Sequence, residues 1–166
     1  MTDANIFIDL INLTLVSHFF ELSLEIHTTL DVLNELYSHQ QEVILAYNSA
    51  KKISIHNLTE EQLSEMQEYA NTRQLSDADK SVIYIAHKIN AMVLSSDGPA
   101  RKFAKSKKLE THGLLWLFDE LVNNKVISQP LACSKINELL GSNRRYREDL
   151  ILAAEFNQRL KDWNNN

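Results

Sequence analysis

The chain has 166 residues, of which 44% are hydrophobic and 23% charged, so its size and composition predict one globular domain and exclude a disordered or fibrous chain. Three glycines and two prolines are too few for the many turns of an all-β sandwich or barrel. The net charge of −5 argues against non-specific coating of DNA, but it is compatible with a nuclease whose acidic residues bind metal ions. The single cysteine, Cys133, and the absence of an apolar run of 18 residues favour a cytoplasmic protein without a membrane span.

The first half of the chain predicts helices that alternate with short strands. The expected elements are an apolar helix over 6–16, a strand over 25–29, a helix over 31–48 and a strand around Ile53 and Ile55. Thr59 and Gln62 have the spacing of a capping box, in which each side chain bonds the backbone of the other, so a helix is expected to begin there.

The second half continues the alternation and ends in helices. Ser76 and Asp77 are alternative caps for a helix over 78–89, and Pro99 suits the first position of another. The remaining elements are a strand over 91–95, a helix over 99–107, a strand over 109–112, and helices over 114–124, over 130–140 (ended by Gly141) and over 146–163. Alternation of this kind predicts a mainly parallel sheet with helices on both faces, in one domain over 1–166 whose C-terminal helices begin near residue 130.

Four acidic residues occur where an open parallel sheet usually binds its ligands, near the carboxyl ends of the strands. Asp97 follows the strand over 91–95, Glu35 lies in the helix that leaves the strand over 25–29, Asp79 opens a helix and Asp3 precedes the first apolar run. Carboxylates that converge repel one another unless cations neutralise them. Such a cluster predicts a site for Mg²⁺ or Mn²⁺, which supports phosphodiester hydrolysis.

Each acid also has an ordinary structural interpretation. Asp77 and Asp79 suit helix N-caps, Asp97 suits a turn, and Glu35 suits a solvated helix face, so only the set favours a functional site. The six histidines do not pair at the spacing of a helical zinc site, and no nucleophile elbow, phosphate-binding loop or dinucleotide fingerprint occurs. These patterns give no support to a zinc enzyme, a serine hydrolase, a nucleotide hydrolase or a Rossmann dehydrogenase.

Four short segments resemble, in order, the motifs of PIN domains. Asp3-Ala4-Asn5 before an apolar helix is similar to the opening motif, and the segment 28–36, which ends in Glu35-Leu36, is similar to the second. The segment 75–82 around Asp79 and the segment 93–97 ending in Ser96-Asp97 are similar to the third and fourth. The resemblance covers about residues 3–140 and is strongest to the branch near the VapC-type toxins.

The resemblance implies a three-layer α/β/α sandwich with a parallel sheet of strand order 3-2-1-4-5. It implies that Asp3, Glu35, Asp79 and Asp97 are catalytic residues that bind Mg²⁺ or Mn²⁺, supported by Asn5 and Ser96. The family's first Asp ends the central strand, whereas only Met1 and Thr2 precede Asp3, so either the start is assigned late or this strand is shortened.

The activity implied by the resemblance is that of a metal-dependent endoribonuclease, the toxin of a toxin–antitoxin pair, with RNA as substrate and a small antitoxin protein as partner. Arg101, Lys102 and Lys105 are expected either to contact RNA phosphates or to form a solvated helix face. The apolar helix over 114–124 is expected in the core or against a second copy of the chain. The alternative function is a catalytically inactive PIN-like binding module.

Overall fold

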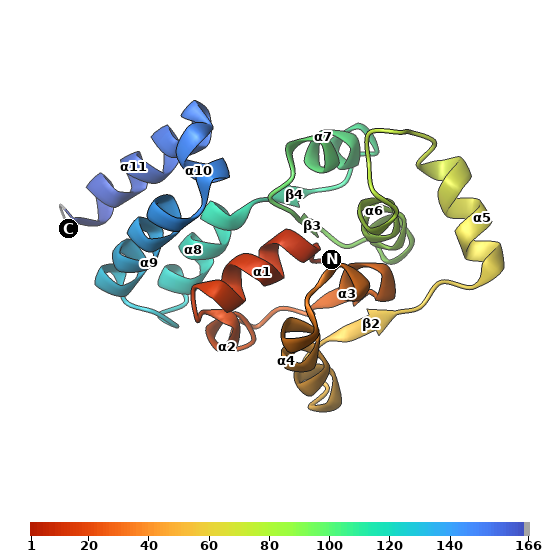
Figure 1. The fold of residues 1–166 in the computed structure, drawn as a ribbon, viewed down its shortest axis with the longest axis horizontal. Coiled ribbons are helices and arrows are strands. Elements are labelled where there is room, and N and C mark those ends of the chain that lie inside the picture. Colours follow the sequence, from red (N-terminus) through yellow and green to blue (C-terminus); the bar gives the residue numbers. More distant parts are fainter. Residues whose placement is uncertain (165–166) are drawn as a thin grey trace. The chain divides into compact units, whose positions relative to one another are not determined.

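The computed structural model describes residues 1–164 and contains helices together with two short parallel sheets (Figure 1). Its residues form two compact units. The first unit contains residues 1–8 and 23–114, and the second contains residues 9–22 and the described residues from 115 onward. Among the described residues, no helix is both long and apolar enough to cross a lipid bilayer.

The first unit carries all four strands assigned in the described chain. After the first turns of α1 (Ala4–Asn12), its elements are β1 (His27–Thr29), α3 (Leu30–Glu35), α4 (Ser38–Ser49), β2 (Ser54–His56), α5 (Glu60–Tyr69), α6 (Asp77–Ile89), β3 (Val93–Leu94), α7 (Gly98–Ser106) and β4 (Thr111–His112). The predicted caps are confirmed, because Thr59 and Gln62 form the capping box of α5 and Ser76 caps α6.

Helix α6 is the central helix of this unit. It contacts α3, α5, α7, β1 and β3, and it is buried nearly all round from Ser81 to Ala86. A helix that is apolar on most of its faces is stable only inside a core. Its polar first turn, with Asp77 and Asp79, therefore marks the end at which the core meets solvent.

The strands pair in parallel, as the alternation of elements predicted. Thr28 lies opposite Ile55 in the sheet of β1 and β2, and Val93 lies opposite Thr111 in the sheet of β3 and β4. Thr2 connects the two sheets, because its N–H donates to the carbonyl of His27 at 2.9 Å and it forms a parallel bridge with Leu94.

The N-terminal segment forms a single bridge, between Thr2 and Leu94, where the resemblance implies the first, central strand. The strands of the described residues form two two-stranded sheets. The strand order 3-2-1-4-5 in a single sheet stays a prediction.

The prediction of one helix over 31–48 is wrong. Helix α3 ends at Glu35 and α4 begins at Ser38, and the two residues between them have extended backbones. The side-chain oxygen of Gln40, which is buried, accepts the backbone N–H of Tyr37 at 3.0 Å and so starts the new helix. Apolar spacing could not reveal this break, because Leu36 and Val43 still share one helical face.

The second unit is helical and differs from the prediction at three boundaries. Its elements, after the last turns of α1, are α2 (Val16–Phe19), α8 (Leu114–Asn123), α9 (Gln129–Ser142), α10 (Arg144–Glu148) and α11 (Leu150–Asn164). The helix predicted over 6–16 stops at Asn12, before Thr14 with its φ of 57°. Helix α9 continues past Gly141, and Asp149 separates α10 from α11, where one helix was predicted.

Candidate active site

Asp3 lies at the entrance to α1 and is only 3% exposed. One carboxylate oxygen, Oδ1, accepts the backbone N–H of Ile6 at 2.9 Å, which caps the helix, and the other, Oδ2, accepts the hydroxyl of Ser95 at 2.5 Å. The N–H of Asp3 donates to the carbonyl of Leu94 at 3.1 Å. These bonds fix the side chain against the end of β3 although only two residues precede it.

Asp97 is half-buried beyond the end of β3 and caps α7. Its Oδ2 accepts the N–H of Ala100 at 2.8 Å, and its own N–H donates to Ser95 Oγ at 3.0 Å. Ser95 therefore bonds to both Asp3 and Asp97. The sequence analysis singled out the neighbouring Ser96, which is also buried, and missed Ser95.

Asp79 lies in the first turn of α6 and belongs to its capping box. Its Oδ2 accepts both the N–H of Ser76, at 3.2 Å, and the hydroxyl of Ser76, at 3.0 Å. Burial raises the pKa of Asp79 above its ordinary value, and the negative charge of Asp97 raises it further, against the lowering effect of the bonds to Ser76. Asp79 and Asp97 thus lie close enough to repel each other.

Glu35 is the last residue of α3 and is solvent-exposed. Desolvation raises its pKa, and so does the charge of Asp79, while a hydrogen bond with the side chain of Ser76 opposes them. Ser76 therefore interacts with both Glu35 and Asp79. Because Asp31 adds a smaller repulsion, this end of α3 faces a negative environment.

The four predicted acids are thus connected through two serines within the first unit. Ser76 lies between Glu35 and Asp79, Ser95 lies between Asp97 and Asp3, and electrostatic repulsion links Asp79 to Asp97. These links join residues that are up to 94 positions apart in the sequence. We refer to Asp3, Glu35, Asp79 and Asp97 as the acidic quartet.

The quartet has the donor chemistry of a hard divalent cation, since carboxylate oxygens are the ligands that Mg²⁺ and Mn²⁺ prefer. Among the described residues, the hydrogen bonds of Asp79 and Asp97 use Oδ2, so that Oδ1 of each is available for a ligand. No three His, Cys, Asp or Glu side chains of the described chain are grouped so that they could hold a metal ion. The quartet therefore has the donor type and the charge for such an ion, but its side chains are not assembled around one position.

Three members of the quartet also cap helices, a role that the structural interpretation predicted for Asp79, whereas it predicted a turn at Asp97. Asp3 caps α1, Asp79 shares the capping box of α6 and Asp97 caps α7. Each helix N-terminus carries partial positive charge, which stabilises a nearby carboxylate. The same three helix ends therefore help to hold several negative charges in one small region.

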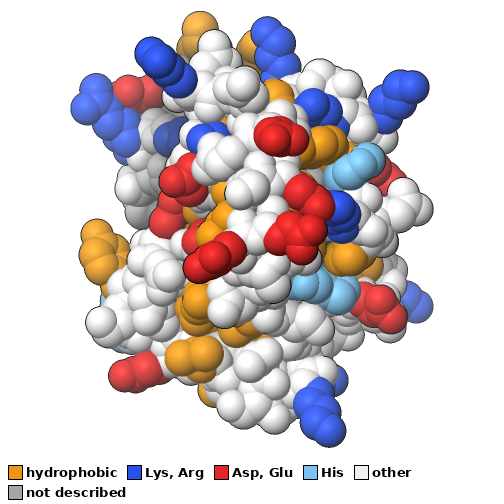
Figure 2. Space-filling view, turned by 90° about the vertical axis from the view of Figure 1, so that its right-hand side faces the viewer, with side chains coloured by type: hydrophobic (Ala, Val, Ile, Leu, Met, Phe, Trp, Pro, Cys, Tyr) orange, Lys and Arg blue, Asp and Glu red, His pale blue; other side chains and the backbone are white. Residues whose placement is uncertain are grey.

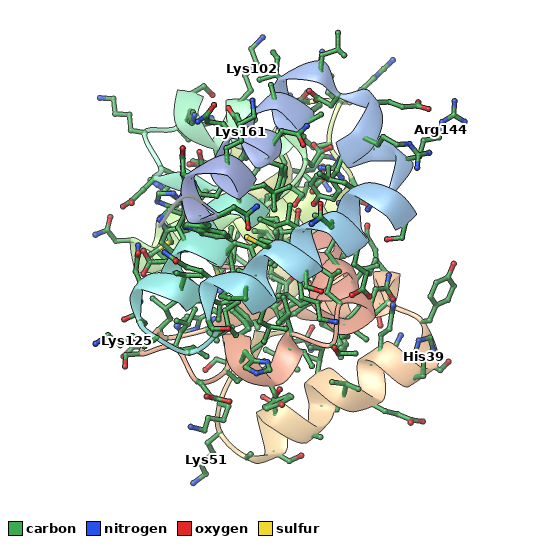
Figure 3. All side chains as sticks on the ribbon, turned by 90° about the vertical axis from the view of Figure 1, so that its left-hand side faces the viewer. His39, Lys51, Lys102, Lys125, Arg144 and Lys161 are labelled. Carbon is green, nitrogen blue, oxygen red and sulfur yellow. The ribbon has the colours of Figure 1, made fainter. Side chains whose placement is uncertain are left out.

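The basic residues predicted to bind RNA lie on α7, which begins at Asp97. Arg101 is half-buried, and its guanidinium donates to the carbonyl of Ser95 at 2.9 Å. Lys102 and Lys105 are exposed, and Figure 3 shows Lys102 extending away from the ribbon. Arg101 thus anchors α7 to the site, while the two lysines are accessible.

Asn5, the other predicted supporting residue, is half-buried in the first turn of α1.

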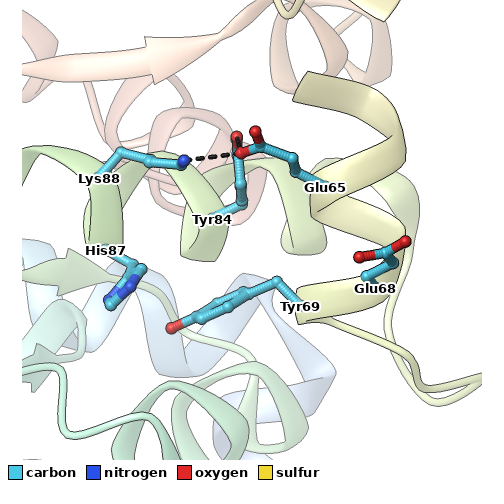
Figure 4. Close-up of a pocket in the computed structure, with 6 residues that line it drawn as sticks. All are labelled: Glu65, Glu68, Tyr69, Tyr84, His87 and Lys88. Carbon is cyan, nitrogen blue, oxygen red and sulfur yellow. Dashed lines mark hydrogen bonds and ion pairs between the residues drawn. The ribbon is translucent and has the colours of Figure 1, made fainter. Parts of the chain in front are cut away.

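A pocket of about 560 Å³ between α5 and α6 lies apart from the quartet (Figure 4). The carboxylate of Glu65 accepts hydrogen bonds from Lys88 and from the hydroxyl of Tyr84, both at 2.6 Å, which ties the two helices together. The pocket is near the C-terminal end of α6, whereas Asp79 is in its first turn.

On the face of the molecule where α5 lies, acidic side chains gather near the centre (Figure 2).

A family model described as a PIN domain matches residues 1–160, which is nearly the whole chain. A search of the curated proteins finds no match.

Proposed function

We propose that this chain, which belongs to the PIN domain family, is an endoribonuclease that depends on Mg²⁺ or Mn²⁺. A PIN domain has a nuclease-type fold, which supports hydrolysis of phosphodiester bonds in a nucleic acid. The observation that supports dependence on a metal ion is the acidic quartet. Its members are held near one another by Ser76 and Ser95 although their charges repel.

Burial contributes most to the raised pKa values of Glu35 and Asp79, and the charge of a neighbouring carboxylate adds to each. Like charges in one region destabilise the folded state unless something neutralises them. Glu35, Asp79 and Asp97 would hold the ion, with Asp3 fixed behind them by Ser95. Bound there, a divalent ion neutralises charge that develops on a phosphate and activates water. Lys102 and Lys105 are exposed on the helix that begins at Asp97 and would contact the RNA backbone.

We also propose that the protein is the toxin of a toxin–antitoxin pair. The support is the resemblance of its four motifs to the VapC-like branch. A small antitoxin would then cover the quartet and keep RNA from the exposed Glu35. A second copy of the chain is a further candidate partner.

The second candidate function, an inactive binding module, is favoured by one observation. Asp3, Asp79 and Asp97 all cap helices, so a purely structural role accounts for each of them separately. Glu35 is exposed, as a solvated helix face would be, so for this residue the two functions differ only in the ion that the nuclease would bind.

Substitution of single carboxylates tests the proposal. Asp97→Asn and Asp79→Asn keep size and shape but remove a charge, and an amide is a poorer ligand for Mg²⁺. We expect metal-dependent cleavage of RNA to fall by orders of magnitude in each variant. The double variant should lose little more, since the residues act as a unit. The matched control is Asp77→Asn, because Asp77 is exposed on the same helix turn and pairs with Lys80.

Cleavage is measured on structured and unstructured RNA with Mg²⁺ and with Mn²⁺, and melting temperatures show that each variant folds. Equal cleavage by the wild type and by Asp97→Asn contradicts the assignment of the site. A folded wild type that cleaves no RNA with either ion favours the inactive binding module.

A further inference from the structure

Tyr37 stands out from the other aromatic residues because it is 71% exposed. Among the described residues, it is the one aromatic side chain in the set of exposed large apolar groups. Phe7, Phe19 and Phe118, by contrast, are almost completely buried. The ring of Tyr37 therefore contributes little to the core and is accessible to a ligand.

The ring of Tyr37 is stacked on the imidazole of His39. The two planes lie 7° from parallel, with their centroids 6.1 Å apart, and His39 is exposed as well. At this separation the two parallel rings are offset from each other, and both are accessible to solvent. A flat, open π-face of this kind is the surface on which a nucleobase stacks.

The backbone that carries the ring is fixed. The N–H of Tyr37 donates to the buried side chain of Gln40 at 3.0 Å, and the side-chain amide of Gln41 donates to the carbonyl of Leu36 at 2.9 Å. Both bonds belong to the start of α4. A ligand that stacks on Tyr37 therefore does not have to order the segment first, which lowers the entropic cost of binding.

The two rings are carried by the segment that directly follows one member of the acidic quartet, Glu35. Tyr37 follows Glu35 by two residues, so their Cα atoms are at most about 7 Å apart. We propose that Tyr37 and His39 form a base-stacking subsite for single-stranded RNA next to the acidic quartet. This inference rests on the proposed function, because it names a contact of the same substrate.

The geometry favours RNA over a protein partner. Two parallel planar rings offer a stacking surface, and stacking accepts any base because every base has a π-face. Bases are free to stack in single-stranded RNA but not inside a duplex. The subsite therefore predicts a preference for unpaired RNA, without selection of one base.

The test is binding of a single-stranded RNA that contains 2-aminopurine, with a chelator present so that no cleavage occurs. We expect Tyr37→Ala to weaken binding by roughly five- to a hundredfold and to abolish the quenching of fluorescence that stacking causes. Tyr37→Phe keeps the ring and should bind as the wild type does. The matched control is Leu45→Ala, since Leu45 is exposed on α4 and is 43% accessible.

The outcomes separate this inference from the function on which it rests. If the wild type binds the RNA and a folded Tyr37→Ala variant binds and quenches equally well, the subsite is wrong while the nuclease assignment stands. The same holds if Tyr37→Phe loses as much affinity as Tyr37→Ala. If the wild type does not bind single-stranded RNA at all, the subsite is wrong, and the proposed function is decided separately by the cleavage of structured and unstructured RNA with Mg²⁺ or Mn²⁺.

Discussion

At the scale of single residues, the candidate site depends on two serines as much as on its acids. Ser95 bonds to Asp3 and Asp97, and Ser76 interacts with Glu35 and Asp79. Asp79 and Asp97 could be proposed as site residues because one opens a helix and the other follows a strand, and their role in a site stays a prediction. The bonds of Ser95 could not be predicted, because two consecutive serines follow β3 and only the folded backbone decides which hydroxyl points to Asp3.

The first prediction concerns the charge of Glu35. Desolvation and the charge of Asp79 raise the pKa of Glu35 above its value in the unfolded chain. The contribution of Glu35 to the stability of the fold is therefore fully present below the unfolded pKa, and it is lost as the pH rises through the folded pKa. We expect Glu35→Gln to match the wild type near pH 3.5 and to be more stable at pH 7, by a few tenths of a kcal/mol after screening by solvent. Urea denaturation at both pH values measures this difference.

Glu42→Gln is the control, since Glu42 is exposed on the neighbouring helix. A Glu35→Gln variant that is no more stable than the wild type at pH 7 would show that the site does not destabilise the glutamate.

At the scale of elements, three of the four acids lie at helix N-termini. Helices α1, α6 and α7 each begin with or near an acid that accepts a backbone N–H or a capping serine. The caps of α5 and α6 could be predicted, because a hydroxyl and an acceptor three residues later form a local pattern. The breaks at Leu36 and Asp149 could not, because they depend on where Gln40 and the C-terminal helices pack.

The second prediction concerns helix α7. If Lys102 and Lys105 contact phosphates, reversing both charges should weaken RNA binding at low salt and reduce the slope of log K against log salt by about two. The control is reversal of Lys51 and Lys52, two exposed lysines that follow α4, which changes the net charge equally. Unchanged binding and slope in the α7 variant would show that Lys102 and Lys105 do not contact RNA and form only a solvated helix face.

The third prediction concerns a buried polar contact in the second unit. Asp9, which is 6% exposed, accepts the hydroxyl of Tyr146 at 2.5 Å and the amide of Asn143 at 3.1 Å. Asp9→Ala removes the acceptor of both groups, and a buried donor without its acceptor costs about 1–3 kcal/mol. We expect a lower urea midpoint for Asp9→Ala, with a smaller loss for Tyr146→Phe, which keeps the packing of the ring.

Asn12, which lies on the same helix but is exposed, offers a comparison. An Asp9→Ala variant that is no less stable than Asn12→Ala would show that the bonds to Tyr146 and Asn143 contribute nothing.

At the scale of the whole molecule, the quartet gathers residues from most of the first unit, between Asp3 and Asp97. The alternation of helices and strands was enough to predict parallel pairing, which β1–β2 and β3–β4 confirm. It was not enough to predict two separate sheets, because the link between them is a single residue, Thr2, whose backbone pairs on both sides. Such a contact leaves no periodic pattern in the sequence.

The central claim is that the acidic quartet binds a divalent cation, and calorimetric titration of Mn²⁺ into the metal-free protein tests it most directly. Wild type and Asp77→Asn should bind the ion and melt at higher temperature in its presence, because a ligand that binds only the folded state stabilises it. Asp79→Asn should bind weakly and show little shift in melting temperature. Absence of binding heat and of any shift in the wild type, or equal binding by wild type and Asp79→Asn, would contradict the account.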